Sequence, residues 1–243
     1  MTKLPAQPVQ GLIDGLAVLR ALAMGPDPVS GKALAAALGL NATRVNRLLK
    51  TLAHLGLAHR TRSRRYTCGP GMHVLAAQAL FGSGLIRAAL PHLEALGCTK
   101  KIVALGVLWR DQVSYLYFHS PGSPPLEALG RAALFPATRS SIGMVLLAEL
   151  TDEEIRAVFR GHRIPGRTGG IRGLLRDLHT IRGQGFAEVK LAGHTMAVKV
   201  GNPAFAAIAL SGRTPAQGVP EQVALLREKA ALIEQELMRE RRT

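Results

Sequence analysis

The chain has 243 residues, of which 47% are hydrophobic and 4% aromatic, and its formal net charge is +15. The hydrophobic fraction excludes a disordered chain, and the few aromatic residues argue against stacking platforms for single-stranded nucleic acid. The excess of positive charge predicts an anionic partner, for which nucleic acid and an anionic membrane surface are the two candidates.

The positive charge is concentrated at the N-terminal end. Residues 1–80 hold ten Lys or Arg against two Asp, whereas the other 163 residues hold 21 basic against 14 acidic residues. We therefore expect the N-terminal part to bind the anion. No stretch reaches 18 uncharged apolar residues, so we expect no transmembrane helix. We expect DNA, and no membrane, as the anionic partner. The N-terminus lacks a signal-peptide core, and two isolated cysteines fit a reducing cytoplasm.

Two helices joined by a tight turn are predicted first. The first covers residues 11–24, and its expected inner stripe is Leu12, Leu16, Leu19 and Ala23. Ser30 is typical of the N-cap of the second helix, which carries Leu34, Ala35 and Leu38 on one side. Gly39 follows directly and provides the left-handed φ that a helix-turn-helix needs at this point.

A third helix begins after Asn41, its expected N-cap. Its inner stripe is Val45, Leu48, Leu49 and Leu52, and its outer face carries Thr43, Arg44, Asn46, Arg47, Lys50 and His54. Arg and Asn are the side chains that pair with guanine and adenine edges in the major groove. A helical bundle with a solvated basic face would show the same pattern, so this helix alone leaves both interpretations open.

A basic hairpin after the third helix favours DNA binding. Residues 57–60 and 66–69 predict two strands, and the turn between them, 61–65, is rich in arginine. A charged hairpin beside a recognition helix is typical of a winged helix-turn-helix, in which the wing contacts phosphate or the minor groove. The residues that we expect at the DNA are Asn41, Thr43, Arg44, Asn46, Arg47, Lys50, Arg60, Arg62, Arg64 and Arg65.

The remaining chain predicts a mixed α+β domain with an antiparallel sheet. Strands are expected at 101–108, 113–118, 186–191, 195–200 and 205–211, and helices at 140–150, 151–160 and 171–182. Thr151 and Glu154 form a predicted capping box. A closing helix carries a near-heptad apolar stripe of Val223, Leu226, Ala230, Ile233 and Leu237.

The order of these elements resembles the IclR family of bacterial transcriptional regulators. The resemblance rests on "GLAVLRALA", "ALAAALGLNATRVNRLLKTLAHLGLAHR", "YTCGPGMHVLA", "PHLEAL", "GRAALFPATRSSIGMVLLAEL", "GQGFAE" and "AAIALSG". It implies a winged helix-turn-helix domain at 1–70, a linker helix at 71–83 and a GAF/PAS-like effector-binding domain at 84–243. It also implies dimers, often paired into tetramers, and the two-fold symmetry of a dimer predicts an inverted-repeat operator.

The resemblance places an effector against "TRSSIG", at the start of a helix. Free backbone N–H groups and the positive dipole end suit a carboxylate there, with Leu134, Ile142 and Met196 over an apolar tail. Ser141-Ile142 and Met144 depart from the family's usual small pair and Lys, and the chain is about three residues shorter between Phe186 and Met196. Ile142 and Met144 make the expected pocket mouth less polar, so we expect a larger or more apolar organic acid. The expected effector residues are Arg139, Ser140, Ser141, Ile142, Gly143, Glu188, Met196 and Ser211.

No catalytic or metal-binding motif is found. The eight histidines are scattered without HxxxH or HExxH spacing, and no nucleophile stands with a base. We therefore expect no enzyme activity, cofactor or metal. The sequence predicts a sequence-specific DNA-binding regulator that senses a small organic acid. The alternative is an architectural protein that binds nucleic acid without sequence preference and uses its C-terminal domain only to form oligomers.

Overall fold

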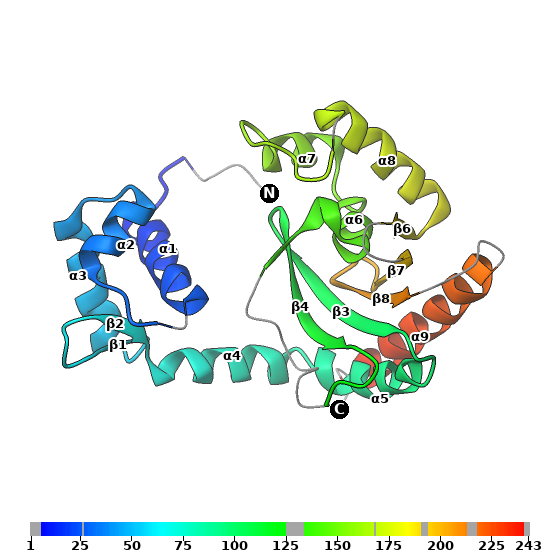
Figure 1. Ribbon diagram of the computed structural model, residues 1–243, viewed down its shortest axis with the longest axis horizontal. Coiled ribbons are helices and arrows are strands. Elements are labelled where there is room, and N and C mark those ends of the chain that lie inside the picture. The colour runs from blue at the N-terminus through cyan, green and yellow to red at the C-terminus, as the bar shows by residue number, and fades with distance from the viewer. Residues whose placement is uncertain are drawn as a thin grey trace. The chain divides into compact units, whose positions relative to one another are not determined.

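The computed structural model describes residues 6–25, 27–124, 134–167, 169–190, 194–212 and 218–240 (Figure 1). The chain divides into two compact units, and the boundary falls between Ser83 and Gly84. No single helix among the described residues is both long and apolar enough to cross a membrane.

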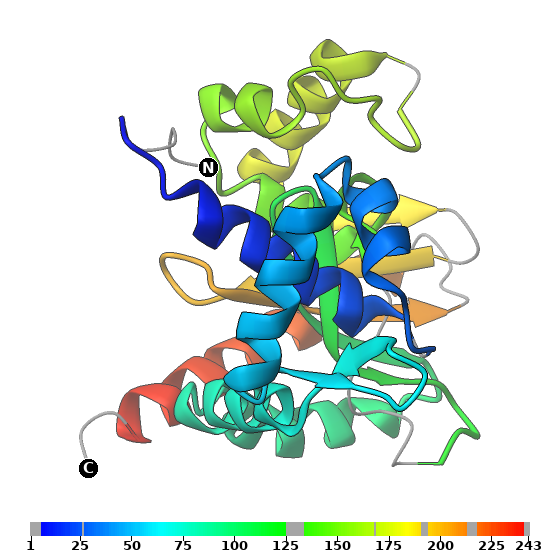
Figure 2. The same cartoon turned by 90° about the vertical axis from the view of Figure 1, so that its left-hand side faces the viewer.

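The N-terminal unit contains three helices, a hairpin and a fourth helix. These are α1 (Gln10–Met24), α2 (Gly31–Leu38), α3 (Ala42–His54), β1 (Ala58–Arg60), β2 (Tyr66–Cys68) and α4 (Pro70–Gly82). Ser30 caps α2 by accepting a hydrogen bond from Ala33 N, and Gly39 ends it with a φ of 64°. The helix-turn-helix and its hairpin are therefore confirmed, and Figure 2 shows α1–α3 in blue with the hairpin in cyan.

The buried face of α1 differs from the predicted one. Asp14, Val18 and Leu22 are buried, whereas Leu12 and Leu16 are 61% and 57% exposed. The expected stripe was therefore wrong at Leu12, Leu16 and Ala23, although Leu19 packs against the core. Two sets of residues in this helix have helical spacing, and the set that is fully buried begins with a charged residue. A hydrophobicity pattern does not select such a face.

The C-terminal unit is built on a six-stranded sheet in the order β5-β4-β3-β8-β7-β6, in which every neighbouring pair is antiparallel. The strands are β3 (Ile102–Trp109), β4 (Gln112–His119), β5 (Phe135–Pro136), β6 (Ala187–Lys190), β7 (His194–Val200) and β8 (Ala206–Gly212). The predicted α+β class is confirmed. Sequence periodicity missed β5 because two residues are too few to show alternation.

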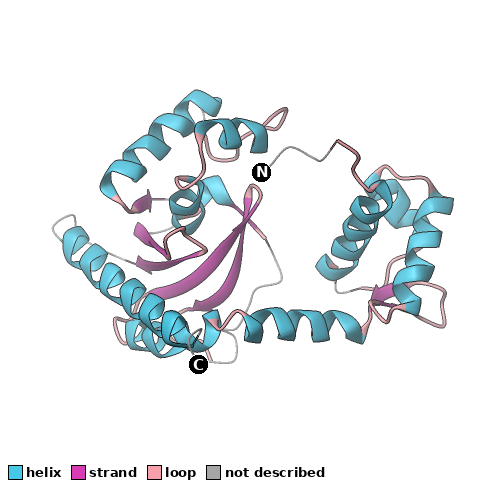
Figure 3. Ribbon diagram, turned by 180° about the vertical axis from the view of Figure 1, so that it is seen from behind, coloured by secondary structure: helices cyan, strands magenta, loops and turns pink. Residues whose placement is uncertain are grey.

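Helices cover both faces of this sheet (Figures 1 and 3). On one face lie α5 (Leu85–Gly97) and α9 (Val219–Glu240), and the predicted α9 stripe is buried throughout. On the other face, α6 (Ser141–Leu147) follows the short 3-10 helix η2 (Ala137–Arg139), and α8 (Gly170–Gln184) packs against α6. The capping box of Thr151 and Glu154 opens α7 (Asp152–Val158), as predicted. None of the helices expected from the sequence corresponds to α5.

Candidate DNA-binding surface and effector site

The helix α3 has one buried and one exposed face. Val45 and Leu49 are fully buried, and Leu52 is 8% exposed. The other face is open over its length, because five of the predicted DNA-binding residues on it are exposed: Thr43, Arg44, Asn46, Arg47 and Lys50. Such a helix can pack on its own unit and still enter a groove of DNA.

The first turn of α3 has internal partners. Asn41 Oδ1 accepts hydrogen bonds from Thr43 N at 2.8 Å and Arg44 N at 3.4 Å, so this side chain caps the helix. Arg44 Nε lies 2.5 Å from Asp14 Oδ2 of α1. Asn46 Oδ1 lies over Gly31, where an added Cβ would come within 2.4 Å of it. The start of α3 is therefore fixed against α1 and α2.

Arg47 and Lys50 lie further along α3. Within the part of the chain that the structure describes, neither side chain has a hydrogen-bond or ion-pair partner. Both are exposed, one turn apart along the helix. They are thus available to a base edge or a phosphate.

The turn of the hairpin is held by its own polar groups. Thr61 Oγ1 accepts a hydrogen bond from Arg65 N at 3.2 Å and lies 2.9 Å from Ser63 Oγ. Arg60 lies over the Tyr66 ring, 5.9 Å from its centroid, and Arg65 Nη1 donates to Pro28 O at 3.4 Å. Arg62 and Arg64 are exposed, with no partner found for either among the described residues.

In the C-terminal unit, the predicted effector loop is tied to β4. Ser140 Oγ accepts a hydrogen bond from Gly143 N at 3.2 Å, which caps α6, and lies 3.0 Å from the hydroxyl of Tyr115. Ser141 is 2% exposed, and no partner is found for its Oγ in the described structure. A buried hydroxyl without a partner is uncommon and indicates a site where a polar group could be added.

Tyr115 links this loop to two further aromatic residues. The rings of Tyr115 and Phe118 meet edge to face at 5.7 Å, and Phe135 lies 6.4 Å from Tyr115. A register shift in the pairing of β3 with β4 leaves Leu116 unopposed, so that Tyr115 and Phe118 lie on the same side of the sheet. The exposed Arg139 lies over Phe135, with its guanidinium carbon 5.9 Å from the ring centroid.

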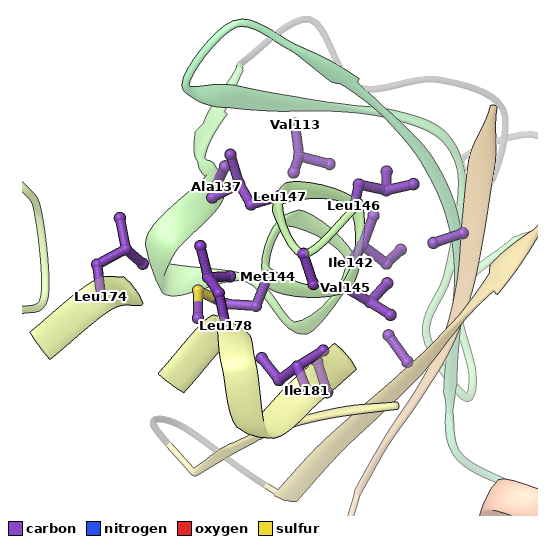
Figure 4. Close-up of a cluster of buried hydrophobic side chains, with 14 of the residues drawn as sticks. Val113, Ala137, Ile142, Met144, Val145, Leu146, Leu147, Leu174, Leu178 and Ile181 are labelled. Carbon is purple, nitrogen blue, oxygen red and sulfur yellow. The ribbon is translucent and has the colours of Figure 1, made fainter. Parts of the chain in front are cut away.

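The helix α6 is buried on all sides (Figure 4). Ile142 is 1% exposed, and its Cγ2 lies 3.1 Å from the position of a Cβ on Gly106. An added Cβ on Gly143 would lie 2.3 Å from Ala137 O, so only glycine fits there. Met144 is buried with its Sδ 3.3 Å from Arg167 Nη2. Ile142 and Met144 therefore pack in the core, and not at the mouth of a pocket as expected from the sequence.

The side chains expected from the later strands divide between the two faces of the sheet. Ser211 Oγ accepts a hydrogen bond from Thr195 Oγ1 at 2.6 Å, and by alternation both lie on the α6 face with Ala197 and Ala209. Met196 packs with α5 and α9 instead. Glu188 stands opposite Met196 in the register and shares its face.

The expected proximity of Met196 to Ile142 was therefore wrong. A shift of one residue along a strand reverses the direction of the side chain, and the sequence alone did not fix this register. On its own face, Glu188 accepts hydrogen bonds from Lys190 and His194. The bond from Lys190 is the larger cause, and together the two bonds hold the pKa of the Glu188 carboxyl below its usual value.

Sequence reasoning missed Tyr115, Phe118 and Thr195. The alternation pattern of a regular strand places Tyr115 and Phe118 on opposite faces, and no signal in the sequence marks the irregularity at Leu116. Among the described residues there is also no group of three or more His, Cys, Asp or Glu that could hold a metal ion.

The sequence of the N-terminal unit matches a known domain. The family model for the IclR helix-turn-helix domain matches residues 14–62, which extend from α1 into the turn of the hairpin. Among curated proteins, none has a sequence similar enough to match this chain.

Solved structures match nearly the whole chain. An IclR family transcriptional regulator from Brucella abortus is 23% identical, with a TM-score of 0.78 over 97% of this chain and 95% of its own. An IclR transcriptional regulator from Alicyclobacillus acidocaldarius is 24% identical, with a TM-score of 0.71 over 94% and 99%.

A third structure contains a small molecule. It is an IclR homologue from Microbacterium hydrocarbonoxydans complexed with 4-hydroxybenzoate, 23% identical, with a TM-score of 0.68 over 92% of this chain and 99% of its own. The fold of these proteins is the fold described above. The resemblance to the IclR family is thus confirmed: the helix-turn-helix of this chain is an IclR domain, and the fold of the whole chain is that of IclR-family regulators.

Proposed function

We propose that the protein is a sequence-specific DNA-binding transcriptional regulator, with α3 in the major groove and the β1–β2 hairpin at the phosphates. The observation that carries this proposal is the open face of α3 beside the basic hairpin: Arg47 and Lys50 on it are exposed, with no partner among the described residues. The net charge of +15 supplies long-range attraction to DNA.

The test is recovery of genomic DNA fragments with the purified full-length protein, followed by binding measurements at increasing salt. We expect one or a few sequences to be enriched and to stay bound at salt concentrations that release random DNA. If the enriched sequences and random DNA were released at the same salt concentration, the protein would instead be an architectural nucleic-acid-binding protein.

We further propose a homodimer that binds an inverted repeat. No residue of α4 is buried. Three of its apolar side chains are largely exposed: Val74 at 54%, Leu75 at 51% and Phe81 at 79%. Apolar surface of this kind on a charged protein favours burial against a second copy. Val74→Glu with Phe81→Glu should lower the mass in solution to that of a monomer, whereas Gln78→Glu, an exposed position on the same helix, should not. A wild-type monomer that binds one half-site tightly would refute this proposal.

For the effector we propose an organic acid bound beside Ser140 and Ser141. Arg139 and the unpartnered Ser141 hydroxyl would hold its carboxylate, and Tyr115, Phe118 and Phe135 would contact an apolar or aromatic body. Thr195 and Ser211 are further polar groups on this face of the sheet. The 4-hydroxybenzoate in the Microbacterium homologue supports an aromatic acid as the first probe.

Two serine variants separate a ligand-binding role from a structural one. Ser140→Ala removes the α6 cap and should cost about 1 kcal/mol of stability without any ligand. Ser141→Ala removes a hydroxyl that has no partner among the described residues, so the free protein should keep its stability. If 4-hydroxybenzoate or benzoate raises the melting temperature of the wild type, Ser141→Ala should reduce that rise. An unchanged rise in both Ser141→Ala and Arg139→Ala would place the ligand elsewhere.

A further inference from the structure

The ion pair between Asp14 and Arg44 joins a buried carboxylate to the recognition helix. The Asp14 side chain is 5% exposed and that of Arg44 is 44% exposed. Gln10 Nε2 donates to Asp14 Oδ1 at 2.8 Å, and Arg44 Nε lies 2.5 Å from Oδ2, off the direction of a hydrogen bond. Asp14 therefore anchors one edge of the guanidinium of a side chain that is nearly half exposed.

Packing alone does not explain an aspartate at this position. Asp14 begins the stripe that continues with Val18 and Leu22, which are 0% and 2% exposed. A buried ion pair contributes little net stability, and apolar side chains of similar volume often stabilise more. An apolar residue would fill the stripe, but it would not hold Arg44.

The position of Arg44 makes an anchor necessary. Arg44 is the third residue of α3, where the positive end of the helix dipole disfavours a cation. The nearby carboxylate offsets that repulsion and restricts the side chain to fewer rotamers. Among the described residues, the terminal nitrogens of Arg44 have no partner. This pair of donors is the one that arginine offers to O6 and N7 of guanine.

We propose that Asp14 is a positioning residue for base recognition: it holds Arg44 by Nε so that Nη1 and Nη2 are presented, pre-ordered, to a guanine in the operator. This inference rests on the proposed DNA-binding function. Arg44 pays less conformational entropy when it is already held before binding, and base discrimination at its contact is correspondingly greater.

The experiment measures dissociation constants of full-length variants on the recovered operator, on each single base-pair variant of it, and on random DNA. Asp14→Leu should weaken operator binding about tenfold, at the low end of what one bidentate base contact provides. The loss of discrimination should fall on the same base pair that Arg44→Ala affects. Binding to random DNA should not weaken, because a negative charge has been removed. Asp14→Asn, which keeps an acceptor of the same shape, should lose less.

A double variant distinguishes positioning from a structural role. In the Arg44→Ala background, Asp14→Leu should have no further effect on operator binding. A further loss of operator binding in the Arg44→Ala background would show that Asp14 only supports the fold. An equal weakening at every base pair would show the same. Tighter operator binding by Asp14→Leu would show that Asp14 withholds Arg44 from DNA, and would also overturn the proposal. A wild-type protein with no sequence preference would refute the proposed function itself, which is a separate result.

Discussion

The helices α3 and α6 lie at the two candidate sites, and they differ in how much of each is buried. Only three residues of α3 are buried, so its sequence separates an apolar stripe from a polar, basic face. All seven residues of α6 are buried, and its sequence, SIGMVLL, has no polar face. In a surface helix, polar residues in the sequence mark the exposed face that can bind a partner. A helix buried on all sides has no such pattern.

The largest effect is expected from a substitution in the buried helix α6, which tests whether that helix is tightly packed. Leu147 is fully buried, so Leu147→Ala should destabilise the C-terminal unit by about 2–5 kcal/mol. Thermal or urea unfolding measures the loss, and Leu147→Met, which nearly conserves volume, is the control. A loss below about 1 kcal/mol would show that α6 is loosely packed.

On α3 the expected effect is on binding rather than stability. Arg47→Ala should weaken operator binding by about 1–3 kcal/mol and relax preference at one base pair, with an unchanged melting temperature. Lys32→Ala removes the same charge from the exposed side of α2 and is the matched control. If Arg47→Ala weakens binding equally on every DNA sequence, Arg47 contacts phosphate and reads no base.

The hairpin should act through charge alone. Replacing Arg62 and Arg65 by Ala and Arg64 by Asn should flatten the salt dependence by up to about one slope unit per lost phosphate contact. Asn is chosen at residue 64 because the φ of Arg64 is 61°, a conformation that Asn tolerates. An unchanged slope would contradict the assignment of this hairpin as a wing.

The smallest expected effect concerns pH and the Glu188 carboxyl. Hydrogen bonds from Lys190 and His194 lower its pKa in the folded protein, so it stabilises the fold above the unfolded pKa of about 4.3. This contribution is lost as the pH falls through the lowered folded value. The melting temperature should therefore fall less steeply between about pH 5.5 and 3 in Glu188→Gln than in the wild type. Parallel curves would show that these bonds contribute nothing in solution.

The sequence predicted those parts of the fold that have local causes. Ser30, Gly39 and the Thr151–Glu154 pair act within one helix turn, and each was found where expected. The faces of α1 and β7 depend on long-range packing, and there the prediction failed for Leu12 and Met196. The pairing of Tyr115 with Ser140 could not be predicted because it depends on an irregularity in β4.

Four of the side chains that the sheet offers to α6 are small, from Ala104, Ala197, Ala207 and Ala209. Each contributes one methyl group to the contact, so the volume available under α6 can be changed by one carbon with glycine or by two carbons with valine. An alanine-to-glycine change would open space for about one methyl group without touching Ser140 or Ser141, and a change to valine would close it. Ligand size and ligand charge would then be set by different residues, which makes this face suitable for engineering a sensor toward larger or smaller acids.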